Sequence, residues 1–109
     1  MERNPDIEVE FKFNGTRRTA VHDGYRPDHL VRDDYLTCGV HHYYDVDGVA
    51  PDGEARGTIT FITPEYYPNC LLVGKKLTIQ EGATIVGHAT ITKIFNPILR
   101  MREPGKHME

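Results

Sequence analysis

The chain has 109 residues, of which 39% are hydrophobic and 27% charged, and its formal net charge is −3. This length fits one domain with one core, and the composition is typical of a folded protein rather than a disordered or membrane-spanning one. The sequence contains no serine, which excludes a serine-based triad, and no Gly-x-x-x-x-Gly-Lys-Thr/Ser string, which excludes a P-loop within it.

Charge and hydropathy bear on location and on partners. No apolar run approaches the roughly 18 residues that a bilayer-spanning helix needs, and the first residues do not resemble a signal peptide. We therefore expect a cytoplasmic protein that does not enter a membrane. Residues 23–65 carry nine acids and three bases, whereas residues 66–109 carry three acids and six bases.

Strand signals begin near the N-terminus. Ile7–Phe13 alternates apolar and charged residues without a break, which is typical of a strand with one buried face. Asn14-Gly15 favours a tight turn after it. We expect a second strand over 17–22, which ends at the turn pair Asp23-Gly24.

Four more strands are expected over 36–46, 55–62, 76–80 and 83–94. Pro64 and Pro68 interrupt the pattern, so 63–74 is expected to be a long connection. Six strands without a helical period predict an all-β fold, and closure removes exposed strand edges. The sequence therefore predicts a small, closed, six-stranded antiparallel β-barrel over residues 1–97, followed by a charged, flexible tail over 98–109.

Three short strings carry a resemblance to a known family. They are Gly-Thr-Arg-Arg-Thr-Ala at 15–20, Gly-Tyr-Arg-Pro-Asp-His-Leu-Val-Arg at 24–32 and Leu-Thr-Ile-Gln-Glu-Gly-Ala-Thr-Ile-Val-Gly at 77–87. In this order they resemble the third, C-terminal β-barrel domain of translation elongation factor Tu, here free-standing. The resemblance runs from about residue 7 to residue 95. It implies a six-stranded barrel that binds macromolecules and lacks the GTPase domain.

The resemblance also implies a rim that contacts the backbone of tRNA. By position, the residues of this rim are Arg17, Arg18, Thr37, Glu81 and Gly82. Guanidinium groups bind phosphate in a bidentate manner, and a glycine lets the backbone approach phosphate closely. The alternative is that Arg17 and Arg18 flank a solvated hairpin and that Glu81-Gly82 is simply a turn.

Several departures from the family pattern weaken the expected contact with tRNA. Asp28, Asp33 and Asp34 add negative charge, and Gln80 replaces a family arginine. Each lost phosphate contact weakens salt-dependent binding. The sequence therefore favours a protein partner over RNA.

Polar aromatic residues suggest a second surface, whose candidate protein-binding residues are His42, Tyr44, Tyr66 and Tyr67. Tyrosine offers a large contact area at low entropic cost. The alternative is that these side chains cover the ends of the barrel.

Neither a metal site nor a cofactor is expected. On a strand, Cys38 and His42 share a face but lie roughly 13 Å apart, and His41 points the other way. We expect Cys38 and Cys70 to be free thiols in a reducing compartment, although a disulfide between them stays open.

The sequence thus predicts a non-enzymatic binding module of the translation apparatus that resembles the elongation-factor barrel. The alternative is an immunity or decoy protein that mimics this barrel and neutralises a basic toxin or a regulator. We expect no catalytic residues.

Overall fold

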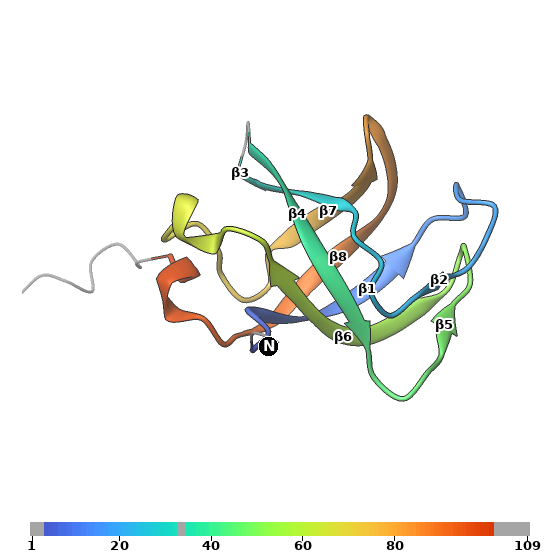
Figure 1. Ribbon diagram of the computed structural model, residues 1–109, viewed down its shortest axis with the longest axis horizontal. Helices are drawn as coiled ribbons and strands as arrows, with labels where there is room; N and C mark the ends of the chain where they lie inside the picture. The colour runs from blue at the N-terminus through green and yellow to red at the C-terminus, as the bar shows by residue number, and fades with distance from the viewer. Residues whose placement is uncertain (1–3, 33–34, 102–109) are drawn as a thin grey trace, which may run out of the picture.

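Six antiparallel strands close into a barrel in the order β1-β6-β4-β3-β7-β8 (Figure 1). The computed structural model describes residues 4–32 and 35–101. The barrel strands are β1 (Ile7–Phe13), β3 (Asp28–Arg32), β4 (Tyr35–Tyr43), β6 (Glu54–Phe61), β7 (Lys76–Glu81) and β8 (Thr84–Ile94). The predicted closed, six-stranded, all-β fold is therefore confirmed.

One expected strand does not join the barrel. Of the segment 17–22, β2 (Val21–His22) alone is extended, and it pairs with β5 (Gly48–Val49) in a separate two-stranded ribbon. Its place in the barrel is taken by β3, which was not expected as a strand. The reason is composition, because residues 15–20 offer no large apolar side chain to the core, whereas β3 buries His29 and Val31.

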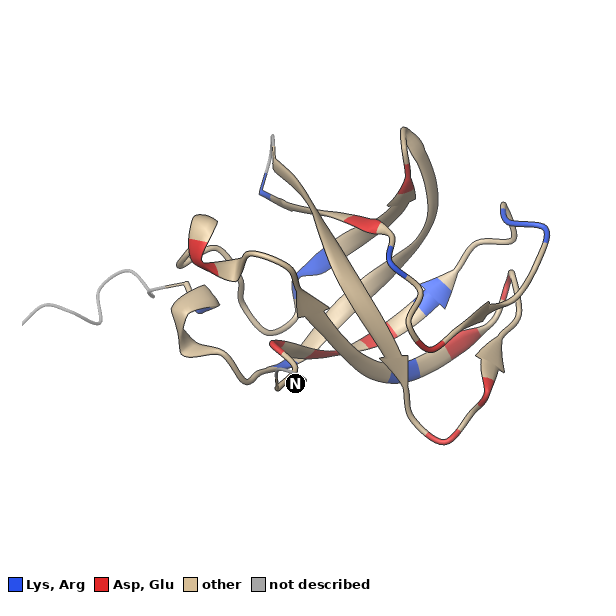
Figure 2. Ribbon diagram, in the orientation of Figure 1, with Lys and Arg blue, Asp and Glu red and all other residues tan. Residues whose placement is uncertain are grey.

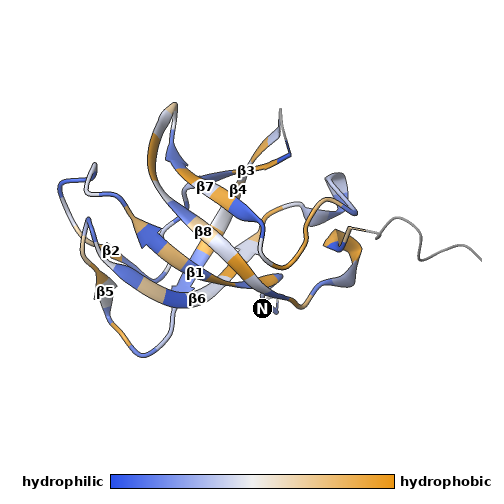
Figure 3. Cartoon of the chain, turned by 180° about the vertical axis from the view of Figure 1, so that it is seen from behind, coloured by the Kyte–Doolittle hydropathy of each residue, from blue (hydrophilic) through white to orange (hydrophobic). Residues whose placement is uncertain are grey.

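The alternation of β1 is borne out from Val9 to Phe13, whereas the charged residue Glu8 is also buried. Ile7, Val9, Phe11 and Phe13 are all buried in the core, and the strand pairs with β6 on one side and β8 on the other. Along β1 and β6, hydrophilic and hydrophobic residues follow one another (Figure 3). Period-two patterning therefore builds the wall of the barrel, as predicted.

Strand β4 buries its more polar face and exposes its more apolar one. Leu36 is exposed and Val40 is half-buried on the outside, whereas Thr37, His41 and Tyr43 are buried inside. The strand ends at Tyr43 rather than at the expected residue 46, because Asp45 has a positive φ of 59° that an extended strand does not allow.

The connection over 63–74 and the C-terminal segment close one end of the barrel. Two single 3₁₀ turns, η1 (Pro64–Tyr66) and η2 (Pro97–Leu99), lie against each other. Leu99 is fully buried, Arg100 bridges to Leu71, and the amide of Met101 donates to the carbonyl of Leu71 over 2.7 Å. The packed chain thus continues past the expected boundary at residue 97, and residues 102–109 of the expected tail lie outside the described residues.

None of the helical turns in the described part of the chain has the length and hydrophobicity needed to span a bilayer.

Candidate functional site

Arg17 is bound within the protein. Its guanidinium pairs with the carboxylate of Glu81 and donates to the hydroxyl of Thr19 over 3.0 Å. It also lies 5.1 Å from the ring centre of Tyr25, whose hydroxyl donates to Glu81 over 2.6 Å. Burial, followed by this hydrogen bond, raises the pKa of Tyr25. The structure thus brings Arg17 and Glu81 together, and Glu81 neutralises the charge that was expected to face phosphate.

The other members of the expected rim are dispersed. Arg18 is exposed on the same loop as Arg17, and Gly82 forms the turn between β7 and β8 with a φ of +62°. Asp28 and Gln80, two of the departures from the family pattern, pair with each other across β3 and β7. Asp33 and Asp34 lie outside the described residues.

Thr37 and Tyr67 are corrections to the expected surfaces. The Thr37 hydroxyl is hydrogen-bonded to the Tyr67 hydroxyl over 3.0 Å, and the two side chains are 7% and 0% exposed. Because β4 turns this face inward, Thr37 cannot contact RNA and Tyr67 cannot contact a protein while the barrel is intact. Their contact helps to seal the end of the barrel that η1 covers.

The remaining members of the second surface lie in two places. His42 is exposed and Tyr44 is half-buried, and both point outward from the end of β4. The Tyr44 hydroxyl donates to Glu8 over 3.1 Å. Tyr66 is 66% exposed on η1, away from these two. The expected tyrosine and histidine surface is therefore divided.

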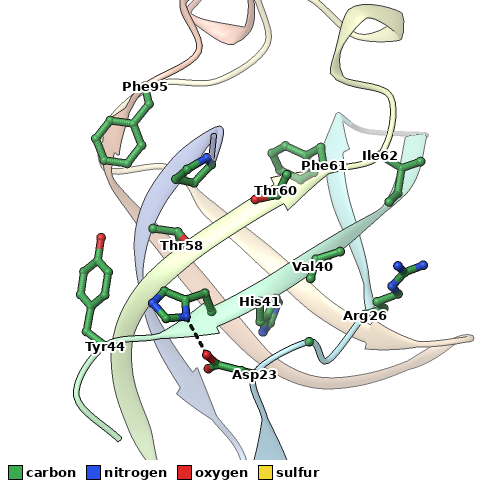
Figure 4. A pocket seen from close by; sticks show the side chains of 13 residues that line it. Asp23, Arg26, Val40, His41, Tyr44, Thr58, Thr60, Phe61, Ile62 and Phe95 are labelled. Atoms are coloured by element: carbon green, nitrogen blue, oxygen red, sulfur yellow. Dashed lines mark hydrogen bonds and ion pairs between the residues drawn. The ribbon is translucent and has the colours of Figure 1, made fainter. Parts of the chain in front are cut away.

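His42 and Tyr44 line a groove of about 770 Å³ on the outer wall of the barrel, which we call the β4–β6 groove. Phe95 and Tyr44 lie on one side of it, Ile62 and Arg26 on the other, with residues of β6 between them (Figure 4). The groove residues are Pro5, Asp23, Gly24, Arg26, Val40, His41, His42, Tyr44, Thr58, Thr60, Phe61, Ile62 and Phe95.

An Asp23–His42 pair fixes the polar part of the groove. His42 Nδ1 lies 2.6 Å from Asp23 Oδ2, and Asp23 Oδ1 accepts the backbone N–H of Tyr43 over 2.8 Å. The Tyr43 amide, and after it His42, lowers the pKa of Asp23. This arrangement holds the imidazole in one orientation and leaves Nε2 to meet a ligand.

Other polar groups of the groove are available for binding. Within the described residues, the half-buried Thr60 hydroxyl has no hydrogen-bond partner, and the exposed Arg26 guanidinium has no ion-pair partner. Thr58 also lines the groove, but its side chain is only 5% exposed. His42 and Thr58 are cross-strand neighbours, so these groups lie side by side. The groove can therefore offer the Thr60 hydroxyl, the His42 imidazole and the Arg26 cation next to apolar walls.

Most of this groove escaped the sequence analysis. Asp23 was assigned only to a turn, and Phe95 only to the end of the stretch that carries the resemblance. The residues come from β4, β6, the β2–β3 loop and both ends of the barrel, so no local spacing links them. The one local signal was the spacing of Val40, His42 and Tyr44 at every second residue, which places their side chains on the same, outer face.

Cys38 and Cys70 are free thiols. Burial raises the pKa of both, and this effect outweighs the nearby cations, Arg26 for Cys38 and Lys75 and Arg32 for Cys70. In residues 4–32 and 35–101, no three His, Cys, Asp or Glu side chains converge in a way that could hold a metal ion.

A comparison with models of known protein families finds no family that matches this chain. The six-stranded barrel is shown by the structure, and the resemblance to the third domain of elongation factor Tu belongs to the proposal below.

Proposed function

We propose that the protein is a non-enzymatic binding module that contacts a protein partner through the β4–β6 groove. The observation that carries this proposal is an outer groove in which apolar side chains flank polar groups with free bonding capacity. Phe95 and Ile62 are 45% and 49% exposed at its two sides. Exposed apolar side chains that flank a concave, polar floor are characteristic of binding sites.

Charge supports a basic partner beside the groove. Acidic residues mark the loops on both sides of β5, at the end of the barrel next to Asp23 (Figure 2). Asp45, Asp47 and Asp52 are exposed there. Opposite charge on a partner would accelerate association and favour one orientation.

A protein partner is favoured over tRNA because of the Arg17–Glu81 pair. Binding phosphate at Arg17 requires breaking this ion pair, and Thr37 is buried beneath the surface. Arg18 then remains as the exposed arginine of the expected rim. The partner we propose belongs to the translation apparatus, in line with the sequence resemblance.

The acidic end also favours a second candidate, in which the barrel is a decoy that captures a basic toxin or a regulator of the elongation factor. The two candidates share the fold and differ in the identity of the captured protein.

The test is affinity capture at several salt concentrations with three versions of the full chain. They are the wild type, an Ile62→Ala/Phe95→Ala groove variant, and an Ile85→Ala/Val73→Ala control. The control removes two side chains that are equally exposed outside the groove. We expect one protein to be retained by the wild type and the control and lost by the groove variant. Equal capture by all three, or background alone, overturns the proposal.

A gel shift with total tRNA separates the remaining possibilities. A salt-sensitive shift that an Arg17→Ala/Arg18→Ala variant abolishes would support RNA binding instead of the groove. If the captured protein is a basic toxin, the decoy is supported, and if it is a ribosomal protein or translation factor, the module is supported.

A further inference from the structure

The barrel closes with very little backbone pairing between β3 and β7. Within the described residues, one residue pair joins these strands, Asp28 with Gln80. The β7–β8 ladder runs from Lys76 to Glu81, and the β1–β8 ladder covers all of β1. We call the β3–β7 contact the seam.

Side chains replace the missing backbone bonds at the seam. The Leu30 amide donates to the Thr78 hydroxyl over 3.0 Å, and His29 Nδ1 donates to the Thr78 carbonyl over 2.8 Å. Near the far end of β3, Lys75 Nζ donates to the Val31 carbonyl over 2.7 Å. The closure of the barrel therefore depends on the chemical state of a few side chains.

His29 continues into a buried chain of hydrogen bonds. Its Nε2 lies 3.1 Å from His41 Nε2, and His41 Nδ1 lies 2.8 Å from the Tyr43 hydroxyl. His29 and His41 are 0% and 1% exposed. The chain therefore crosses the interior of the barrel from β4 through β3 to β7.

One arrangement of protons satisfies every member of this chain when both rings are neutral. A carbonyl can only accept, so His29 Nδ1 carries the hydrogen and His29 Nε2 is an acceptor. His41 Nε2–H then donates to His29, and the Tyr43 hydroxyl donates to His41 Nδ1. A first additional proton on His41 Nδ1 reverses the bond to the Tyr43 hydroxyl and places a positive charge inside the barrel. A second proton forces two N–H groups to face each other.

The surroundings offer little to stabilise that charge. The Phe11 ring lies 4.3 Å from the His41 ring, and the Phe61 ring lies 6.2 Å from the His29 ring. Within the described residues, neither imidazole is hydrogen-bonded to a carboxylate. Burial lowers the pKa of His29 to about 4 and lowers that of His41 well below its usual value.

The other titratable groups around the chain come from four segments. Tyr25, in the β2–β3 loop, packs on the His41 ring. Its hydroxyl donates to Glu81, and the Arg17 guanidinium lies over its ring. Asp23 binds the Tyr43 amide, and Lys75 lies at the seam before β7. The Glu81 carboxylate is paired with Arg17, and the Asp23 carboxylate is hydrogen-bonded to His42 and to the Tyr43 amide.

We propose that the seam is an acid-sensitive closure, which opens between β3 and β7 when the His29–His41 pair is protonated. Opening frees the backbone groups of two strand edges, which are sites for pairing with another strand. Above about pH 6.5 the histidines are neutral in both the open and the closed state, so the closure is fully stable. As the pH falls from about 6.5 to about 4, the open state takes up protons first and the closure weakens.

The test is amide hydrogen exchange of the full chain by NMR from pH 7 to pH 4.5, corrected for the intrinsic exchange rates. We expect the opening constant of the Leu30 amide, which donates across the seam, to rise about tenfold per pH unit below pH 6.5 for each histidine that titrates. The amides of β1 and β8 should keep their protection over the same range.

Two variants and one direct measurement complete the test. His29→Gln should reduce the pH dependence at the seam to the part that His41 contributes, and the His88→Gln control, at an exposed site on β8, should leave the wild-type dependence unchanged. Ring titration of the wild type by NMR follows His29 and His41 even if a variant fails to fold. The proposal is overturned if both rings titrate near pH 6.5 in the closed barrel, or if the β1 and β8 amides open in parallel with the seam.

Discussion

The polar side chains that shape this barrel bind partners far away in the sequence. Arg17 and Glu81 are 64 residues apart, and Thr37 and Tyr67 are 30 residues apart. Such pairs leave no local pattern, so the sequence could indicate an arginine near a turn but not the carboxylate that neutralises it. At the scale of single residues, the structure therefore turns expected ligand-binding groups into structural ones.

Thr37 allows a direct test of this conclusion. Thr37→Val keeps the shape of the side chain but leaves the buried Tyr67 hydroxyl without its partner, so we expect a loss of about 1–2 kcal/mol in the free energy of unfolding. Urea denaturation measures the loss, with Thr84→Val at an exposed site as the control. If Thr37→Val changes binding to tRNA and leaves stability intact, Thr37 is a contact residue after all.

Individual strands differ in how well their sequence predicts them. β1 was predicted to the residue because its alternation is complete and a turn follows it. The buried face of β4 could not be predicted from hydropathy, because its apolar residues Leu36 and Val40 lie on the outside. Its polar face can be buried because His41 is hydrogen-bonded to His29. β3 was missed because it is short, and because its seam is held by side chains rather than by a ladder.

Glycines lie where neighbouring strands approach closely, so substituting them tests how strands pack. A Cβ at Gly57 would lie 1.9 Å from the His42 carbonyl oxygen, so Gly57→Ala must push β6 away from β4. We expect a cost of about 3 kcal/mol or more, or failure to fold.

Gly82→Ala is the matched comparison. A Cβ at Gly82 meets nothing within 4 Å, and its positive φ alone makes the substitution unfavourable by about 1 kcal/mol. Thermal unfolding of the two variants should rank them in this order. Equal losses would contradict the close approach of β4 and β6.

For the whole molecule, the closed barrel follows from alternation and turns, whereas the packing of its C-terminal end does not. Pro97 suggested the end of the domain, yet Leu99 fills a buried position next to Leu71 two residues later. A single leucine in a charged segment gives no periodic signal, so its burial becomes visible only when the fold is known.

Shortening the chain tests where the domain ends. A chain that stops at residue 97 loses the burial of Leu99, which contributes about 2–3 kcal/mol, so its melting temperature should fall by roughly 10 °C or more. A chain that stops at residue 101 should melt within about 2 °C of the full chain. Thermal unfolding by circular dichroism measures both, and identical melting of the two would show that η2 adds nothing to stability.

The two ends of the barrel wall meet at one point. The Asp6 carbonyl accepts the amides of Phe95 and Asn96 over 2.9 and 3.1 Å, and the Asn96 side chain donates to the Asp6 carboxylate over 2.8 Å. Entry to and exit from the wall are therefore adjacent. The first and last strands of the wall are thus fastened to each other at Asp6, before the chain continues into residues 97–101, which close the end of the barrel.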